Sequence, residues 1–257
     1  IAKRWIWNNR DVKILLGGDA LAYAEYACIF AGKIMQTVFT EETFTLEIES
    51  KAFALLRSLP INNYWTSTWA ELDPAAEGKP IPYYWGSYNS AQAPLVTCID
   101  VNYDANSSQW KICDTAFHAI KSITQVYIDY GAGGGWETIA HANESLANAT
   151  FTIATKPVLG TTRVKVAFEG YHVASVLIEG APEIVEDMLL NQCGYVAGDL
   201  LAASFTASKA LSDATLNVAI ESEESALDVI ERICQSDLAF FDEDGAGLLR
   251  YRTWEPS

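Results

Sequence analysis

The stretch "GKPIPYYWG", residues 78–86, combines two prolines with three consecutive aromatic residues. The prolines hold the backbone extended and each removes a backbone N–H, which is unfavourable in the middle of a sheet. The aromatic side chains offer a large apolar area that favours burial. We therefore predict an ordered junction between two modules, with Trp85 partly buried. The alternative is an edge strand with aromatic packing.

The residues before this stretch predict mainly β structure. "VKILL" (12–16) is a short apolar run that ends at two glycines. "FTLEIES" (44–50) alternates apolar and polar residues, as a strand with one buried face does. Together with "GKIMQTVF" (32–39) it predicts a hairpin across "TEE". "SKAFALLRSL" (50–59) predicts a short helix that ends at Pro60.

The residues that follow, up to Gly170, predict a small β sandwich or barrel. Residues 60–94 are rich in proline, tryptophan and tyrosine, and short apolar runs then alternate with polar turns. The predicted strands are "LVTCIDVNY" (95–103), "QWKIC" (109–113), "QVYIDY" (125–130), "ATFTIA" (149–154) and "RVKVAFEG" (163–170).

Helical patterns begin after Gly170. Residues 181–194 and 204–212 predict two helices, residues 214–220 predict a strand, and residues 222–237 predict the clearest helix of the chain. Ser222 is the expected N-cap of that last helix. Its expected buried stripe is Ala226, Leu227, Ile230, Ile233 and Cys234. "LAFFDEDGAGLLRYRTW" (238–254) predicts a closing hairpin with its turn near Asp244.

These patterns predict an α+β fold that is mainly β and has three domains in chain order. Residues 1–77 form a partial, β-barrel-like N-terminal domain. Residues 78–170 form an inserted small β module. Residues 171–257 form an α+β module of helix, helix, strand, helix and hairpin.

The charge of the chain disfavours two classes of partner. There are 33 acidic residues against 17 basic ones, a formal net charge of −16. Phosphate contacts need clustered lysine and arginine, so specific nucleic-acid binding is disfavoured, as is docking on an anionic membrane. We expect no membrane-spanning segment, because no run reaches roughly 20 apolar residues. The chain begins with Ile and has no signal peptide, so we expect an interior piece of a longer protein.

No motif predicts a catalytic, cofactor-binding or metal-binding residue, and no cofactor is expected. The glycine-rich loop 129–136 lacks the P-loop pattern, and "FFDEDG" (240–245) lacks the ligand spacing of a calcium loop, so both are expected to be hairpin turns. There is no GxSxG nucleophile elbow. The five cysteines form no CxxC pair and are expected to be reduced and buried: Cys28, Cys98, Cys113, Cys193 and Cys234.

Two alternatives stay open at this point. Sequence cannot show whether cysteines and histidines meet in space, and a pair of catalytic carboxylates cannot be recognised among so many acidic residues. Because tryptophan-rich surfaces also bind sugars, a carbohydrate-binding or carbohydrate-cleaving β-rich module is the alternative function.

The order of several short motifs resembles a known family. The motifs are "GKPIPYYWG", "QWKICDTAFHAIKSITQVYIDYG", "ATFTIATKP", "TTRVKVAFEGY", "APEIVEDMLLNQCG", "ASFTA" and "LNVAIESEESALDVIERICQSDLAFFDEDGAGLLRYR". In this order, over roughly residues 10–255, they are similar to the baseplate hub or tail-associated hub proteins of bacteriophage tails. Related hubs occur in gene transfer agents and contractile injection systems.

This resemblance implies a structural, non-enzymatic role in the virion. Residues 1–77 would be an incomplete hub β-barrel, and the chain would form a homotrimeric ring that closes the tail tube and connects it to tip or fibre proteins. The implied neighbours are tail tube or distal tail proteins, tip or fibre proteins and the tape measure protein. Assembly would take place in the cytoplasm of the bacterial host. Surplus carboxylates could then line a channel through which DNA passes without being held.

Overall fold

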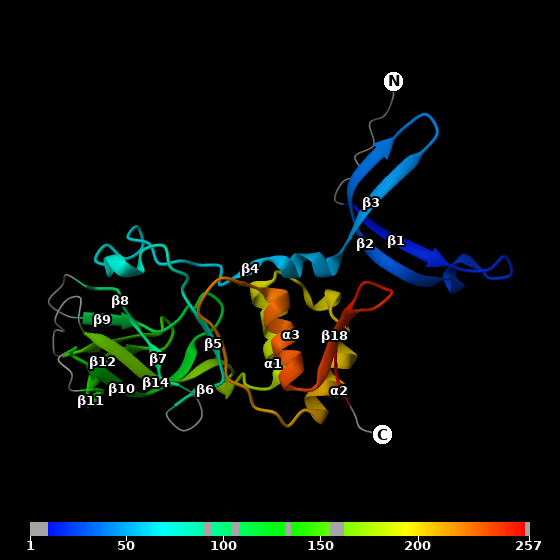
Figure 1. The fold of residues 1–257 in the computed structure, drawn as a ribbon. Helices are drawn as coiled ribbons and strands as arrows, with labels where there is room; N and C mark the ends of the chain where they lie inside the picture. The colour runs from blue at the N-terminus through cyan, green and yellow to red at the C-terminus, as the bar shows by residue number, and fades with distance from the viewer. Residues whose placement is uncertain (1–9, 90–93, 104–107, 132–134, 155–161, 255–257) are drawn as a thin grey trace. The chain divides into compact units, whose positions relative to one another are not determined.

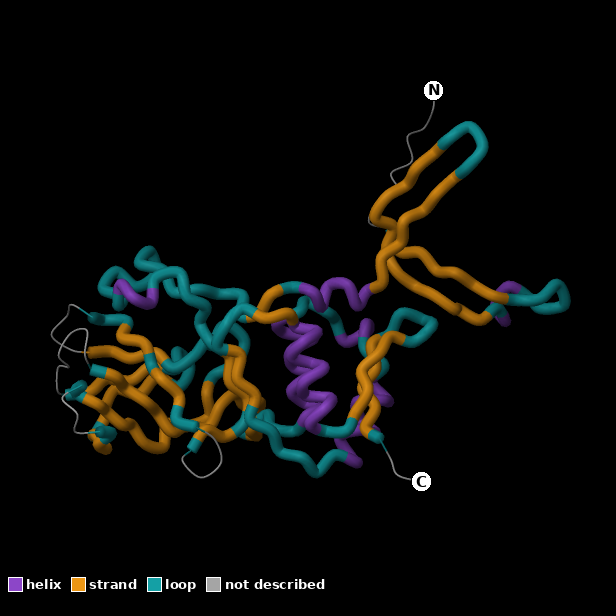
Figure 2. Tube along the Cα trace, in the orientation of Figure 1, coloured by secondary structure: helices purple, strands orange, loops and turns teal. Residues whose placement is uncertain are grey.

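The computed structural model describes residues 10–89, 94–103, 108–131, 135–154 and 162–254. Strands predominate over helices (Figures 1 and 2), which confirms the predicted α+β fold with β structure in the majority. The chain groups into two compact units. Unit 1 contains residues 1–57, 188–212 and 226–257, and unit 2 contains residues 58–187 and 213–225. Each unit combines segments that are far apart in the sequence, whereas the predicted division into three domains follows chain order. That division stays a prediction.

Unit 1 begins with an antiparallel sheet in the strand order β1-β2-β3. Its strands are β1 (Asp11–Leu16), β2 (Ala27–Phe39) and β3 (Phe44–Ser50), and a 3-10 turn (Tyr23–Glu25) precedes β2. The predicted hairpin between β2 and β3 is confirmed. The hydroxyl of Thr40 closes its turn by accepting a hydrogen bond from the backbone N–H of Thr43. The continuation of this sheet into a barrel stays a prediction.

The short helix predicted after β3 is a 3-10 helix, Lys51–Leu56. The side chain of Ser50 caps it by accepting a hydrogen bond from the backbone N–H of Ala52. Leu55 is its fully buried residue. The chain is already extended at Arg57, so the helix ends before Pro60.

The helical part of unit 1 packs against the closing hairpin, whose prediction is confirmed. The elements are a π-helical turn (Met188–Gln192), a 3-10 turn (Ala197–Asp199), α2 (Ala202–Leu211), α3 (Ala226–Ser236), β18 (Ala239–Glu243) and β19 (Leu249–Thr253). Tyr251 of β19 packs against Phe205 of α2, and its hydroxyl donates to Asp237 at 2.8 Å. This places the core of the unit between α2, α3 and the hairpin.

The last helix begins four residues later than expected. Ser222 is not its N-cap, because Glu224 and Ser225 form a short strand, β17, that pairs with β4 (Ser58–Leu59). Strand pairing uses the backbone groups that an earlier helical turn would need. Within α3, Val229 is fully buried and Leu227 only half-buried, which shifts the expected stripe by part of a turn.

Unit 2 contains two larger antiparallel sheets whose strands alternate along the chain. The larger has β11 (Glu137–Ile139), β10 (Ile120–Asp129), β14 (Arg163–Val173) and β15 (Val176–Leu177) side by side, with β6 (Ser87–Tyr88) and β7 (Val96–Thr97) also paired to β14. The other has the order β12 (His141–Ser145), β13 (Thr150–Ile153), β9 (Ser108–Lys111) and β8 (Ile99–Asp100). The remaining elements are β5 (Tyr83–Trp85), β16 (Val218–Ile220), a 3-10 turn (Pro74–Ala76) and α1 (Ala181–Asp187).

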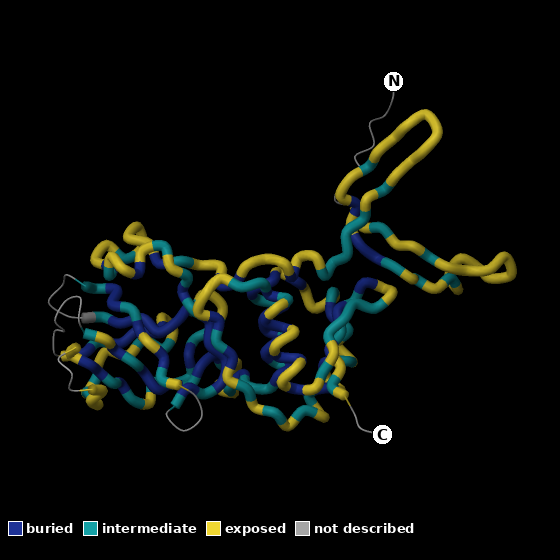
Figure 3. The backbone as a smooth tube through the Cα atoms, viewed as in Figure 1, coloured by how far each residue is buried: buried dark blue, intermediate teal, exposed yellow. Residues whose placement is uncertain are grey.

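The opening stretch 78–86 is ordered within unit 2, and its residues 83–86 are buried. Its aromatic residues form β5, which pairs with β16, and Figure 3 shows this region in the colour of buried residues. Trp85 is 0% exposed, and its indole N–H donates to Asp187 at 2.8 Å. Gly86 follows with φ +88°, and a Cβ there would lie 2.2 Å from the carbonyl oxygen of Leu216. The stretch thus joins the strands of residues 78–170 to segments from beyond Gly170, and the predicted burial of Trp85 is confirmed.

Candidate functional sites

The sheet of unit 1 carries most, but not all, of its large apolar side chains on one face, since Leu15 and Val38 lie on the other. Residues that pair across antiparallel strands point to the same side of the sheet. The register places Ile34 opposite Ile48 and Phe39 opposite Phe44, whose rings stack at 4.6 Å. Pairing and alternation along the strands define the apolar face as Val12, Ile14, Leu16, Phe30, Ile34, Phe39, Phe44, Leu46 and Ile48.

Much of the apolar face is open to solvent. Leu16 is 63% exposed, Phe39 64% and Phe44 49%, while Ile34 is buried. Figure 3 shows most of these strands in the colour of exposed residues. The opposite face carries charged residues, among them Lys13, Lys33, Glu47 and Glu49. The face expected to be buried is therefore apolar, but the described part of the chain leaves it partly uncovered.

The second feature is a cavity in unit 2, formed by the loop between β4 and β5. Backbone hydrogen bonds hold this loop closed: Tyr64 donates to the carbonyl of Lys79, and Gly78 donates to the carbonyl of Tyr64, both at 2.8 Å. A small buried cluster lies beneath the loop, made of Tyr64, Leu72, Ala76, Ile81 and Val101. Trp69 packs against that cluster, so the loop presents its tryptophans from a fixed backbone.

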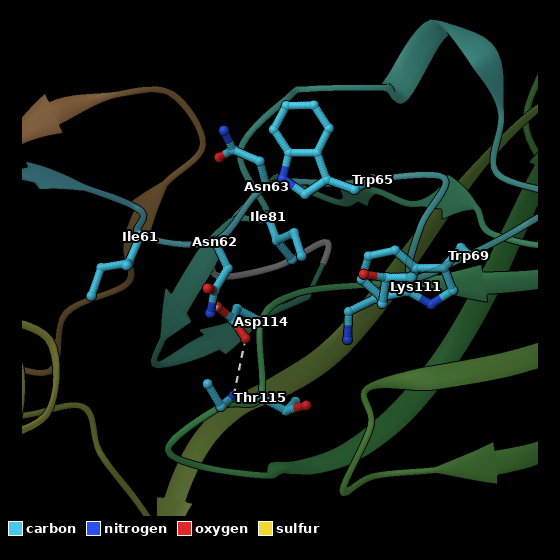
Figure 4. A pocket seen from close by; sticks show the side chains of 11 residues that line it. Ile61, Asn62, Asn63, Trp65, Trp69, Ile81, Lys111, Asp114 and Thr115 are labelled. Carbon is cyan, nitrogen blue, oxygen red and sulfur yellow. Dashed lines mark hydrogen bonds between the residues drawn. The ribbon is translucent and has the colours of Figure 1, made fainter.

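The cavity has a volume of about 480 Å³, and aromatic and polar side chains line it together (Figure 4). The lining residues are Ile61, Asn62, Asn63, Trp65, Thr68, Trp69, Ile81, Lys111, Asp114, Thr115 and Ala116. Trp65 is 48% exposed and stands at the wall of the cavity, whereas Trp69 is half-buried with its ring 5.6 Å from that of Tyr64.

Lys111, the last residue of β9, brings a buried amine to the cavity. Its side chain is buried, its Nζ lies 5.9 Å from the centre of the Trp69 ring, and it donates a hydrogen bond to the carbonyl of Asn148 at 2.8 Å. Burial lowers the pKa of this amine, while the nearby groups of Cys113 and Asp114 act in the opposite direction.

Asp114 brings a buried carboxylate to the same cavity. One carboxylate oxygen accepts from the side-chain amide of Asn62 at 2.7 Å, and the other accepts from the backbone N–H of Ala116 at 3.0 Å. The backbone of Asp114 is also tied down, since its N–H donates to the carbonyl of Pro82 and its own carbonyl accepts from the hydroxyl of Tyr171. These contacts fix the carboxylate in the lining of the cavity that Lys111 also lines, below Trp65 in Figure 4.

Sequence reasoning missed these cavity residues. The tryptophans of "NNYWTSTW" (62–69) lie in the aromatic segment that kept sugar binding open, so they were a partial signal. Lys111 and Asp114 gave none, because the contacts that bring them to this loop, such as that of Asp114 with Asn62, join residues far apart in the sequence.

Comparison of the chain with protein-family models, with curated proteins and with solved structures finds no match. The resemblance to tail hub proteins is therefore carried by the sequence motifs alone. Among the described residues, no helix is long and apolar enough to cross a membrane. Within the same ranges, no group of three or more His, Cys, Asp and Glu side chains is arranged to hold a metal ion.

The glycine-rich loop and the acidic motif considered in the sequence analysis lie at hairpin connections in the described part of the chain. The loop 129–136 joins β10 to β11, with residues 132–134 outside the described ranges, and Asp129 accepts a hydrogen bond from the backbone of Gly131. "FFDEDG" leads into the turn of the β18–β19 hairpin. All five cysteines are free thiols, as predicted. Cys28 is half-buried, and burial raises the pKa of the other four, that of Cys113 to about 12, which disfavours a reactive thiolate.

Proposed function

We propose that this chain is a structural component of a bacteriophage tail tip or baseplate hub, where it closes the tail tube and connects it to tip or fibre proteins. The order of motifs over residues 10–255 and the mainly β fold support the proposal. The observation that carries it is the open apolar face of unit 1. Folded monomers rarely keep large contiguous apolar patches exposed, and such patches mark association surfaces.

The apolar face fits association with further copies of the same chain. Each copy carries a net charge of −16, so copies repel one another at long range, and a stable contact needs apolar area that gains from leaving water. The two stacked phenylalanines, Phe39 and Phe44, are the aromatic anchors typical of such contacts. A head-to-tail arrangement of three copies would close into a ring.

The proposed role implies a set of neighbouring proteins. In the virion, the homotrimer contacts tail tube or distal tail proteins, tip or fibre proteins and the tape measure protein, and it is assembled in the bacterial cytoplasm. It performs no catalysis in this segment and binds no nucleic acid specifically. DNA passes through the ring, and part of the surplus carboxylates face that channel.

Imaging of a tail particle tests this function. The producing phage or particle is purified and its tail is reconstructed by electron cryo-microscopy with no symmetry imposed. We expect density for this chain on the tail axis, in three copies, at the end of the tube. Particles that lack the chain, or that carry it in one copy away from the axis, would contradict the proposal. The same map shows whether acidic residues face the bore.

A further inference from the structure

The cavity of unit 2 has hydrogen-bond acceptors and donors that the described contacts leave unused. A carboxylate offers about four acceptor positions, and the described contacts of Asp114 use one for Asn62 and one for Ala116. A lysine ammonium has three donors, and Asn148 takes one of those of Lys111. Both residues are more than nine-tenths buried and line the cavity, so their remaining capacity is available to a ligand bound there.

This combination suits hydroxyl groups. A hydroxyl donates one hydrogen bond and accepts others, so adjacent hydroxyls can donate to Asp114 and accept from Lys111. A simple anion would meet the carboxylate of Asp114, and a simple cation would meet the amine of Lys111. Neither ion is compatible with both groups, whereas a neutral polyol is.

The tryptophans supply the complementary apolar surface. Trp65 keeps 48% of its area exposed although its backbone is fixed by the hydrogen-bonded loop, and Trp69 is a second indole in the cavity lining. A pyranose ring has an apolar C–H face that packs on an indole, while its hydroxyls project from the edge. Asn62, Asn63, Thr68 and Thr115 add further polar groups around the rim.

We propose that this cavity binds a neutral saccharide, with Trp65 as the stacking platform and Asp114 and Lys111 as the acceptor and donor for adjacent hydroxyls. Its volume of about 480 Å³ lies in the range of small-ligand sites. The site binds rather than cleaves, because glycoside hydrolysis commonly uses two carboxylates and Asp114 is the single one among the described lining residues. This binding goes beyond the structural role proposed above and does not depend on it.

Titration with defined sugars tests the site. The ¹⁵N-labelled chain is mixed with cellotriose, maltotriose, chitotriose and lactose, and the indole N–H signals are followed by NMR, with the Trp65 signal assigned from Trp65→Phe. At least one of these sugars is expected to shift the Trp65 signal with a dissociation constant on the order of 1 mM. Trp65→Ala and Asp114→Asn are each expected to weaken that binding about tenfold or more.

Matched variants outside the cavity serve as controls. Trp254→Ala removes a tryptophan of similar exposure from unit 1, and Asp213→Asn removes an exposed carboxylate from unit 2, and both should bind as the unmodified chain does. If Asp114→Asn loses the dispersed NMR spectrum of a folded chain, Trp65→Ala decides alone, because its ring is half-exposed. Absence of any shift at millimolar sugar overturns the proposal, as does binding that survives Trp65→Ala. If the cavity instead receives a loop of a partner protein, no sugar should shift the Trp65 signal.

Discussion

At the scale of single residues, Lys111 combines a cost to folding with a use in binding. Its amine is buried beside Trp69, and burial of a charged amine destabilises the folded state unless partners compensate. Replacement by methionine, which has nearly the same shape, should raise the free energy of unfolding by about 1 kcal/mol near pH 7. The same variant should lose saccharide binding. Urea denaturation measures the first effect and the NMR titration the second.

The pH dependence of that gain follows from the lowered pKa of Lys111. When the pKa in the folded state lies below that in the unfolded state, the unfolded chain binds more protons, so stability rises with pH across the interval between the two values. The advantage of Lys111→Met should therefore be full below the lowered pKa of the folded state and shrink as pH rises from there toward the ordinary lysine value of 10.5. Lys79→Met, at an exposed lysine of the same unit, is the matched control for the loss of one positive charge. A loss of stability in Lys111→Met would mean that its hydrogen bond to Asn148 outweighs the cost of burial.

Individual residues also show what sequence reasoning reaches. The burial of Trp85 follows from its own neighbours in "YYW", because three adjacent aromatics need cover on both sides of a strand. The partner of its indole does not follow, since Asp187 lies 102 positions later and also contacts His118. Local pattern thus predicts that a side chain is buried, whereas the groups that satisfy its polar atoms depend on long-range topology.

At the scale of elements, the turn of the β18–β19 hairpin shows how a loop is fixed by a few atoms. Asp244 accepts hydrogen bonds from the backbone N–H groups of Ala246 and Leu248, both at 2.9 Å. Gly247 has φ +80°, and a Cβ there would lie 2.8 Å from the Cβ of Ala31 in β2. Gly247→Ala should therefore lower the free energy of unfolding by about 1–2 kcal/mol, because it adds a strained backbone to a steric clash.

Gly198 of the same unit provides the matched control for this substitution. A Cβ at Gly198 would meet no atom within 4 Å, so Gly198→Ala should change stability by less than about 0.5 kcal/mol. Both variants are compared by the midpoint of urea unfolding at an unchanged slope. Equal midpoints for the two would show that the hairpin turn does not rest on β2 as the structure has it.

Elements also mark where prediction from sequence fails. The predicted strand 95–103 is divided at Cys98, because β7 pairs with β14 and β8 with β9. Apolar residues recur along the whole segment, and nothing local indicates that it serves two sheets. The start of α3 fails for a related reason, since pairing of β17 with β4 takes the residues that the capping pattern assigned to a helix.

At the scale of the whole molecule, each compact unit is assembled from separated segments. Unit 1 takes the N-terminal strands together with residues 188–212 and the C-terminal helix and hairpin. Changes in composition along the chain cannot reveal such a unit, because they mark neighbours in sequence and not neighbours in space. The cavity is likewise assembled from separated segments, because Trp65 and Trp69 lie in one segment and Lys111 and Asp114 lie in another. The fold class was predictable from the spacing of apolar residues and the order of the predicted elements, whereas the site was not.

The apolar face of unit 1 yields the last prediction, which concerns association of the chain. We expect the purified chain to form oligomers with rising concentration, measured as mass by analytical ultracentrifugation. The double substitution Phe39→Glu and Phe44→Glu places two charges at the stacked anchors and should leave a monomer. It should not alter saccharide binding, because the cavity belongs to unit 2.

Salt and a matched double variant separate apolar association from charge effects. Since each copy carries a net charge of −16, screening should strengthen association as salt is raised, whereas an interface held by ion pairs would weaken. Phe53→Glu with Phe240→Glu adds the same charge at two exposed phenylalanines of unit 1 outside the apolar face, and it should associate as the unmodified chain does. Equal loss of association in both double variants would assign the effect to charge alone and would remove the apolar face as the contact between copies. Under the proposed function, such a face would instead contact a different tail protein, which the particle reconstruction would show directly.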